Sequence, residues 1–307
     1  MEDISKYVEE LRANPNVREK DLGNNISSFN FTKKAFKKGL WDKQTIKSRG
    51  LFIDVEQNKI IARSFDKFFE ERDKNGKTIK EIEYPVTLYK KENGFLGITS
   101  GGKDGSELFI ASKSTDQGEF RDMFSKILEA QVGSSTMSAM ANYLYRSNQS
   151  AIFEVIDPEN DPHIVKYNRK EVVLLALVEN EIEFKQRPYS EVKWFADLIR
   201  VKPKQKVYTA TTPDTLCDYL VSNLSQVDLE GFVMEDASGY MLKWKSPWYK
   251  IWKRYRSVLK NPYKPVKYWV NQGLDRNIVE LIETWGPLNP RGNIIEFRDW
   301  YEAGLDN

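Results

Sequence analysis

The sequence predicts an α+β fold, made mainly of antiparallel sheet with flanking helices and followed by a small helical C-terminal module. Up to about Lys245, short alternating apolar runs are separated by turn-forming residues, which is typical of antiparallel strands. Longer amphipathic stretches interrupt these runs, as expected of helices that cover a sheet. Beyond Lys245 the pattern becomes helical, basic and aromatic. We therefore expect a main domain over residues 1–250 and a module over residues 251–307.

The first part of the chain predicts one helix and two hairpins. The opening segment MEDISKYVEELR is amphipathic and predicts the helix. Apolar residues alternate across Leu51–Arg63 around a polar Gln57–Asn58 turn, which indicates a hairpin. In YPVTLYKKENGFLGITS, the pair Asn93–Gly94 separates two strand-like runs and predicts a second hairpin. The segment ELFIASKS then continues the sheet.

The middle of the chain alternates between helical and strand-like patterns of apolar residues. GEFRDMFSKILEAQV and SAMANYLYR predict helices that cover the sheet. Strands resume at AIFEVI, HIVKY and VVLLALV, with helices near Glu191–Arg200 and Thr212–Leu224. The segment LEGFVMEDASGYMLKWK predicts a last hairpin that turns at Ser238–Gly239.

The composition limits the available chemistry. Of the 307 residues, 40% are hydrophobic, which is enough for a substantial core, and the net charge is only +2. The single cysteine, Cys217, cannot form an intramolecular disulfide. The single histidine, His163, excludes a two-histidine metal site, and we expect it on the solvated surface. Catalysis must therefore depend on lysines, carboxylates or hydroxyls.

No export or membrane pattern is visible in the sequence. The acidic opening segment lacks the basic start and apolar run of a signal peptide. The longest apolar stretch, around Val172–Val178, is far shorter than the roughly 20 residues that a bilayer-spanning helix needs. We expect an intracellular, cytoplasmic protein with no membrane partner, and a monomer.

Charge is concentrated in one segment near the C-terminus. From Lys243 to Tyr268 there are nine Lys or Arg residues and no acid, interleaved with aromatic residues. Such a segment can neutralise phosphates and stack on unpaired bases. We expect Lys243 and Lys245 in a catalytic pocket and the remaining cations on RNA. Packing of the aromatic rings in a helical core explains their presence equally well.

Lys91 is the candidate nucleophile. It lies just before Asn93–Gly94, where glycine tolerates a positive φ. A lysine that attacks an α-phosphate must lose its proton, which neighbouring cations and partial burial promote. Lys243 and Lys245 are two residues apart on a strand and share a face. Glu230 could hold Mg²⁺ against the phosphate.

Seven short motifs occur in a consistent order, and together they resemble one family. RGLFI, SFDKFF, KENG, FEVIDP…HIV, LLALVENE, LEGFV and LKWKSPWY are similar to the T-even-phage-type RNA ligase 1 family, to which the sealing domain of fungal tRNA ligases is related. The resemblance runs from about Arg49 to Tyr249. It implies a nucleotidyltransferase fold of the ATP-grasp-like ligase type. It also implies three steps: adenylylation of a lysine by ATP, AMP transfer to an RNA 5′-phosphate, and attack by a 3′-hydroxyl.

The resemblance assigns roles to individual residues. Lys91 becomes the nucleophile, Glu230 the metal-associated acid, and Lys243 with Lys245 the pair that grips the α-phosphate. The implied cofactors are ATP and Mg²⁺ (or Mn²⁺), and the implied partner is RNA with 5′-phosphate and 3′-hydroxyl ends, with tRNA as one candidate. The positions that match nucleotide-handling residues of the family are Arg49, Lys67, Phe69, Gly94, Lys113, Glu154, Gly231 and Tyr249.

Three of these nucleotide-handling assignments are more specific. Glu154 is expected near the ribose, Lys113 near a phosphate, and Gly231 where the backbone approaches closely. Structural roles remain as alternatives: an exposed arginine at Arg49, a core aromatic ring at Phe69 and Tyr249, and a buried carboxylate at Glu154.

Other functions remain open at this stage. A DNA ligase and an mRNA-capping guanylyltransferase use the same lysine and carboxylate logic, although RGLFI, FEVIDP and KWKSPWY favour an RNA ligase. A non-catalytic RNA-binding protein on this fold is a third alternative. The segment after Lys245 either docks RNA or braces the main domain. No GxxxxGK[ST] loop occurs, so end-preparing kinase activity is not expected.

Overall fold

The N-terminal elements form a small sheet with a helix packed on it. The structure is a computed structural model that describes residues 3–305. The predicted first helix and first hairpin are confirmed, and they are joined by two further strands and two short helices that the pattern did not indicate. Helix α1 buries Tyr7, Val8 and Leu11 against Phe29 of the sheet. The strands are antiparallel in the order β1-β2-β3-β4. The elements are α1 (Ile4–Ala13), β1 (Val17–Asp21), β2 (Ile26–Phe31), α2 (Lys33–Lys38), α3 (Lys43–Lys47), β3 (Leu51–Asp54) and β4 (Lys59–Arg63).

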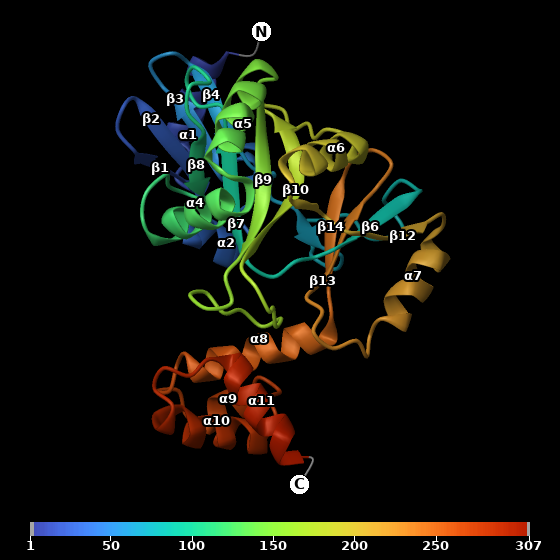
Figure 1. Cartoon of the computed structure of the whole chain (residues 1–307). Coiled ribbons are helices and arrows are strands. Elements are labelled where there is room, and N and C mark those ends of the chain that lie inside the picture. Colours follow the sequence, from blue (N-terminus) through green and yellow to red (C-terminus); the bar gives the residue numbers. More distant parts are fainter. Residues whose placement is uncertain (1–2, 306–307) are drawn as a thin grey trace.

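The second sheet carries the largest core. Three helices cover one of its faces, α4 (Glu119–Val132), α5 (Ser134–Arg146) and α6 (Tyr189–Ile199) (Figure 1). All three helices are predicted from the sequence. The sheet order is β11-β10-β9-β7-β8, and its pairs are antiparallel except β10 with β11. Its strands are β7 (Phe95–Ser100), β8 (Phe109–Ser112), β9 (Gln149–Ile156), β10 (Glu171–Glu179) and β11 (Lys202–Pro203).

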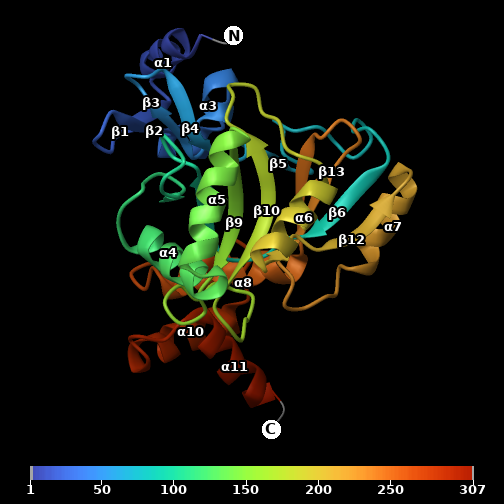
Figure 2. The same ribbon diagram turned by 45° about the horizontal axis from the view of Figure 1, so that its top comes forward.

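The third sheet lies beside the second, and helix α7 (Pro213–Ser222) packs against it (Figure 2). The predicted hairpin that turns at Ser238–Gly239 is confirmed as the antiparallel pair β13 and β14. The order is β12-β6-β13-β14-β5, with only β14 and β5 parallel. The strands are β5 (Phe69–Glu70), β6 (Val86–Lys90), β12 (Lys206–Ala210), β13 (Gly231–Glu235) and β14 (Met241–Lys245). The fold is thus α+β and mainly antiparallel, as predicted.

The hairpin predicted across Asn93–Gly94 is wrong. Strands β6 and β7 both exist, but β6 pairs with β12 and β13 in the third sheet, and β7 pairs with β8 and β9 in the second. Gly94 does not adopt a positive φ. A Cβ at this position would instead lie 2.0 Å from the carbonyl oxygen of Val155. Glycine is required because the chain crosses from one sheet to the other in contact with β9.

The strand predicted for HIVKY is also wrong. Residues 157–170 form a loop between β9 and β10, which we call the 157–170 loop. Its apolar residues Ile164 and Val165 are buried, but against the C-terminal helices rather than in a sheet. Their backbone N–H groups both donate to Oδ1 of Asn93, at 3.0 and 3.1 Å. The side chain of Asn93 thus accepts backbone hydrogen bonds that a neighbouring strand would accept in a sheet.

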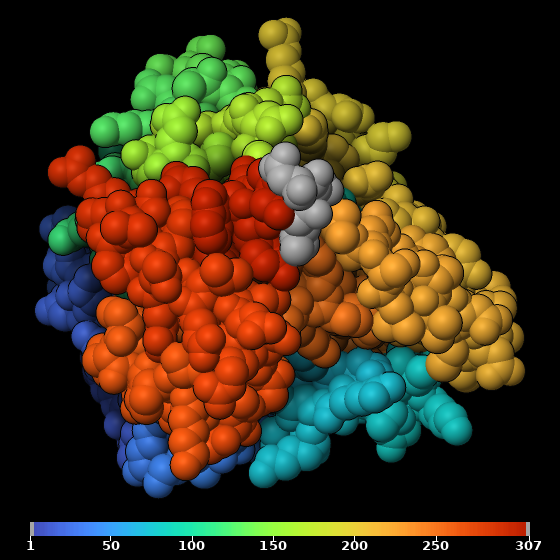
Figure 3. Space-filling view, turned by 90° about the horizontal axis from the view of Figure 1, so that it is seen from below, coloured from blue at the N-terminus to red at the C-terminus, as the bar shows by residue number. Residues whose placement is uncertain are grey.

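The C-terminal helices form a module with its own core below the sheets (Figure 1). The rings of Trp252, Tyr255 and Trp269 are buried in this core, so these aromatic residues serve packing, whereas Tyr263 and Tyr268 are exposed. Seen from below, the module covers much of that face and lies against the yellow-green 157–170 loop (Figure 3). Helix α8 crosses residue 250, where the boundary was predicted. The helices are α8 (Pro247–Leu259), α9 (Val266–Val270), α10 (Arg276–Leu288) and α11 (Ile294–Leu305).

No helix within residues 3–305 has the length and apolar character that crossing a membrane requires.

Candidate active site

Residues from distant parts of the chain meet in one cavity of about 330 Å³. Lys91 follows β6, Glu154 lies on β9, and Glu230 immediately precedes β13. The cavity therefore lies where the second and third sheets face each other, with α8 contributing one wall. The predicted residues that line it are Arg49, Lys67, Lys91, Gly94, Glu154, Glu230, Lys243, Lys245 and Tyr249.

Lys91 is held as an ion pair. Its Nζ lies 2.9 Å from Oε1 of Glu230, whose side chain is only 4% exposed. Burial by itself lowers the pKa of Lys91, but the negative charges of Glu230 and Glu154 outweigh burial, and the net pKa is raised above its usual value. The expectation that surrounding cations would lower the pKa of Lys91 is therefore wrong for the nucleotide-free protein. The charges of these two carboxylates decide the direction of the shift.

Asn93 organises the catalytic carboxylate. Its Nδ2 donates to Oε2 of Glu230 at 2.7 Å and to the hydroxyl of Tyr249 at 3.4 Å. Its Oδ1 accepts from the 157–170 loop, and its own backbone N–H donates to the hydroxyl of Tyr167 at 2.8 Å. The side chain is buried, and both its amide nitrogen and its amide oxygen have hydrogen-bond partners. Sequence reasoning treated Asn93 only as a turn residue and missed this role, because its partners lie far away in the sequence.

Glu154 faces Lys91 from the second sheet. Its Oε1 accepts the backbone N–H of Gly94 at 2.7 Å, which ties the carboxylate to the lysine segment. Burial raises the pKa of Glu154, while the charge of Lys91 opposes that effect. The structure thus brings the predicted glutamate to the cavity that holds the nucleophile.

Positive charge dominates the cavity wall. Burial and the neighbouring charges of Lys67 and Lys245 lower the pKa of Lys243 to about 7. Burial likewise lowers the pKa of Lys67 to about 8. Three glutamates accompany nine basic residues, and a cavity of this kind fits a polyanion. The basic residues are Arg49, Lys67, Lys90, Lys91, Lys204, Lys243, Lys245, Lys253 and Arg256.

Two of these cations were assigned elsewhere by sequence reasoning. Lys253 and Arg256 lie on α8 and were expected on an RNA-binding surface away from the pocket, whereas they line the cavity itself. The acid-free run was the signal that could have found them. His163 was expected in solvent but also lines the cavity, with its Nε2 2.7 Å from Oδ2 of Asp161. A histidine that follows a proline carries no local sign of such a position.

Three of the residues predicted to handle the nucleotide do not line the cavity. Phe69 is buried in β5, with Nζ of Lys67 3.7 Å from its ring centroid, and Phe68 lines the cavity instead. Nζ of Lys113 lies 4.4 Å over the ring of Phe31. The carbonyl of Gly231 accepts the backbone N–H of Lys91 at 2.9 Å.

Gly231 has the close backbone approach that the family resemblance implied. Its φ is +148°, and a Cβ there would lie 2.0 Å from the carbonyl oxygen of Trp244. The close contact is with the neighbouring strand β14. The carbonyl of Gly231, through its hydrogen bond to the Lys91 N–H, holds the Lys91 segment next to β13.

The carboxylates of the cavity are suited to a metal ion that is bound partly by phosphate. Among residues 3–305 there is no group of three or more His, Cys, Asp or Glu that could hold a metal by itself. Mg²⁺ commonly uses one or two carboxylates together with water and substrate phosphates. Glu230 and Glu154 can supply those one or two carboxylates.

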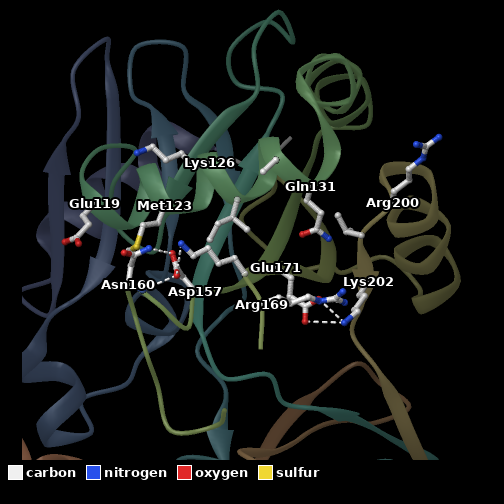
Figure 4. Close-up of a pocket in the computed structure, with 14 residues that line it drawn as sticks. Glu119, Met123, Lys126, Gln131, Asp157, Asn160, Arg169, Glu171, Arg200 and Lys202 are labelled. Atoms are coloured by element: carbon white, nitrogen blue, oxygen red, sulfur yellow. Dashed lines mark hydrogen bonds and ion pairs between the residues drawn. The ribbon is translucent and has the colours of Figure 1, made fainter. Parts of the chain in front are cut away.

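A larger cavity, of about 830 Å³, lies between α4 and the edge of the second sheet (Figure 4). Five of its charged groups are paired with one another: Lys202 lies 2.8 Å and Arg169 3.1 Å from Glu171, and Lys170 lies 3.6 Å from Asp157. Arg200 points away from it (Figure 4). The smaller cavity holds Lys91, the predicted nucleophile, and is therefore the candidate active site.

Comparisons with known proteins agree with the geometry. A model of the RNA ligase family matches residues 47–249. A tRNA ligase of Candida albicans is 25% identical over 320 aligned residues, which cover 85% of this chain and 37% of that protein. This chain thus spans little more than a third of that relative's length.

Solved structures show the fold. An archaeal ATP-dependent RNA ligase is similar with a TM-score of 0.58, at 14% identity over 91% of this chain and 70% of its own. A protein of Aquifex aeolicus assigned as an ATP-dependent DNA ligase has a TM-score of 0.54, at 13% identity over 97% and 75%. The predicted ligase-type nucleotidyltransferase fold is confirmed.

Proposed function

This chain belongs to the RNA ligase family, and from that premise we propose that it is an ATP-dependent RNA ligase that carries AMP on Lys91. The observation that supports this best is the meeting of a lysine, two glutamates and a group of cations in one cavity. A binding protein needs the cations but has no use for a lysine paired with the buried Glu230 at 2.9 Å.

Adenylylation is the first proposed step. Nζ of Lys91 attacks the α-phosphorus of ATP, a P–N bond forms, and the bond to the β-phosphate breaks to release pyrophosphate. The nearest acceptor for the lysine proton is Oε1 of Glu230. Lys243 and Lys245 supply positive charge as the phosphate changes partners. A divalent cation, when bound, would neutralise further phosphate charge, and Glu230 is the residue that would hold it.

The remaining steps transfer AMP and seal the ends. An oxygen of the RNA 5′-phosphate attacks the lysyl-AMP phosphorus, which breaks the P–N bond and regenerates Lys91. A 3′-hydroxyl then attacks the 5′-phosphorus, forms the phosphodiester and expels AMP. Both transfers concentrate negative charge at the same position, and the basic wall can serve both.

The nucleotide is proposed to place its base against the apolar part of the cavity. Glu154 is proposed for the ribose, because a carboxylate accepts hydrogen bonds from hydroxyl groups. Arg49 has a buried Nη1 without a partner among the described residues, so a phosphate would satisfy it. The apolar residues that line the cavity include Phe65, Phe68, Leu96, Leu175 and Met241.

One experiment tests the proposed chemistry. Purified protein is incubated with labelled ATP or GTP and with Mg²⁺ or Mn²⁺, and the covalent adduct is mapped by mass spectrometry. We expect AMP on Lys91 and none in Lys91→Ala. Label on Lys90, or label that persists in Lys91→Ala, would contradict the assignment. Labelling by GTP alone would favour a capping enzyme.

The sealed substrate is proposed to be RNA with 5′-phosphate and 3′-hydroxyl ends, and tRNA halves in particular. The similarity to a tRNA ligase supports tRNA. Sealing assays with paired tRNA halves, an unstructured RNA and a nicked DNA separate the possibilities. Sealing of nicked DNA but of neither RNA would favour a DNA ligase.

A further inference from the structure

Besides the residues of α8 that line the cavity, a buried side chain of α11, Arg298, connects the C-terminal module to the active site. Its exposure is 3%, and its guanidinium stacks over the rings of Trp248 and Trp252, at 4.8 and 5.7 Å from the ring centroids. Its Nη1 donates to the carbonyl oxygen of Ile164 at 2.8 Å. Its Nη2 also donates to Oδ1 of Asp228 at 3.4 Å, a carboxylate whose side chain is exposed. A buried guanidinium is costly to desolvate, so the shorter hydrogen bond to the buried Ile164 indicates where it acts.

The carbonyl of Ile164 belongs to the same peptide group as the N–H of Val165. Arg298 holds the oxygen of that peptide group, and Oδ1 of Asn93 accepts its N–H at 3.1 Å. Both polar atoms of this peptide group are therefore hydrogen-bonded to side chains, and rotating the peptide plane would break both hydrogen bonds. Hydrogen bonds linked in this way also polarise one another.

Asn93 continues this path to the reacting lysine. Its amide can turn only if it loses the two loop N–H groups, and its Nδ2 donates to Oε2 of Glu230 at 2.7 Å. Oε1 of the same carboxylate pairs with Nζ of Lys91 at 2.9 Å. The orientation of Glu230, and so of Lys91, depends on the 157–170 loop.

We propose that the C-terminal module is part of the adenylylation machinery, and that Arg298 is a positioning residue that orients Glu230 and Lys91 through the Ile164–Val165 peptide group and Asn93. This inference rests on the proposed function. It gives the module a role in the first chemical step, before any RNA is bound.

The test compares Arg298→Met with a matched control. Methionine retains an apolar side chain over Trp248 and Trp252 but cannot donate to Ile164. The control, Lys166→Ala, breaks the exposed 2.6 Å ion pair with Asp299, which joins the same loop to the same helix but leads to no pocket residue. Exposed ion pairs contribute little to stability.

We expect Arg298→Met to slow single-turnover formation of lysyl-AMP by about tenfold or more at saturating ATP, because small misplacements of reacting groups are costly. The KM for ATP should change less than about twofold, since Arg298 does not line the cavity. A purely structural role would lower the labelled fraction and leave the rate of that fraction unchanged. Lys166→Ala should match the wild type in both.

A double-mutant cycle tests the route. If Arg298 acts through Asn93, the pair Arg298→Met with Asn93→Ala should be little slower than Asn93→Ala alone, whereas independent effects would multiply. Arg298→Lys, which retains a donor, should recover part of the rate, and it replaces Arg298→Met in the cycle if that variant does not fold. Multiplicative effects, or a wild-type rate in a folded Arg298 variant, would overturn the proposal.

Hydrogen exchange provides a readout that does not depend on activity. Peptides that cover residues 161–167 and 90–94 should both lose protection in Arg298→Met and retain it in Lys166→Ala. Loss confined to residues 161–167 would overturn the coupling. If the wild-type protein takes no label from ATP, the proposed function fails, and the exchange result still decides whether Arg298 orders the lysine segment.

Discussion

Lys91 and Glu230 show how a single contact sets a charge state. The pKa of Lys91 is raised because its carboxylate neighbours outweigh burial. We therefore expect that in Glu230→Gln the pKa of Lys91 falls, because burial then meets less opposition. NMR titration of lysine side chains in the nucleotide-free protein measures this shift. Glu92→Gln is the matched control and should leave Lys91 as it is; an equal fall in both variants would contradict the assignment.

Lys243 is the residue whose charge changes nearest to neutral pH. Its pKa is lowered to about 7, so at pH 8 most molecules carry a neutral Lys243. A polyphosphate beside it favours the ammonium form. We therefore expect ATP binding at pH 8 to take up protons, and the uptake to decline below pH 7, where the ammonium is already present. Titration calorimetry in two buffers of different ionisation enthalpy measures the uptake.

Lys243→Arg is the control for this prediction, because a guanidinium remains charged throughout the range. Most of the proton uptake should disappear in this variant. Lys67, with a pKa of about 8, accounts for a smaller remainder. Uptake that is unchanged in Lys243→Arg would show that another group titrates.

At the scale of elements, the crossing between sheets at Gly94 is a point of very close packing beside Lys91. A Cβ at residue 94 would meet the backbone of β9, which cannot move aside as a flexible side chain could. We expect Gly94→Ala to cost about 1–3 kcal/mol of unfolding free energy and to slow adenylylation. Denaturant unfolding and lysyl-AMP formation measure the two effects. Gly304→Ala, in helix α11 with no neighbouring atom within 4 Å of its added Cβ, is the control and should not destabilise the protein, because alanine favours a helix over glycine.

Helix α8 gives two cations to the cavity, and this separates them from the rest of the basic run. We expect the double change of Lys253→Ala and Arg256→Ala to slow adenylylation by about tenfold, because each removes positive charge from the phosphate wall. Lys260→Ala, at an exposed position one turn later, should leave the adduct rate unchanged. Equal adenylylation rates in all variants would mean that Lys253 and Arg256 do not act on ATP and would leave them only an RNA-binding role.

The core of the C-terminal module extends across the predicted domain boundary. Ile164 and Val165 of the 157–170 loop are buried together with Trp252, Trp285 and Phe297 of the helical module. We therefore expect the module and the sheets to unfold in one transition, with equal calorimetric and van't Hoff enthalpies. Differential scanning calorimetry is the measurement. Two resolved transitions would mean that the module folds independently, and would also weaken the case for coupling through Arg298.

Much of this organisation follows from the sequence alone. The α+β class, most helices and strands, and the final hairpin follow from periodicity, because amphipathic patterns act within a few residues of one another. The candidate site was also largely accessible, since lysine chemistry on a phosphate demands a nucleophile, acids and cations. Lys91, Glu154, Glu230, Lys243 and Lys245 all meet in one cavity.

Only the tertiary structure decided which segments pair and which side chains face each other. The Asn93–Gly94 signal describes a local turn, yet strand pairing depends on partners far away in the sequence, more than a hundred residues away for β6, and these partners separate β6 from β7. Asn93, His163 and Arg298 gain their places from the folded 157–170 loop, for which no local pattern exists. A lysine's position can be deduced from the chemistry it must perform, whereas the groups that orient it are chosen by long-range packing.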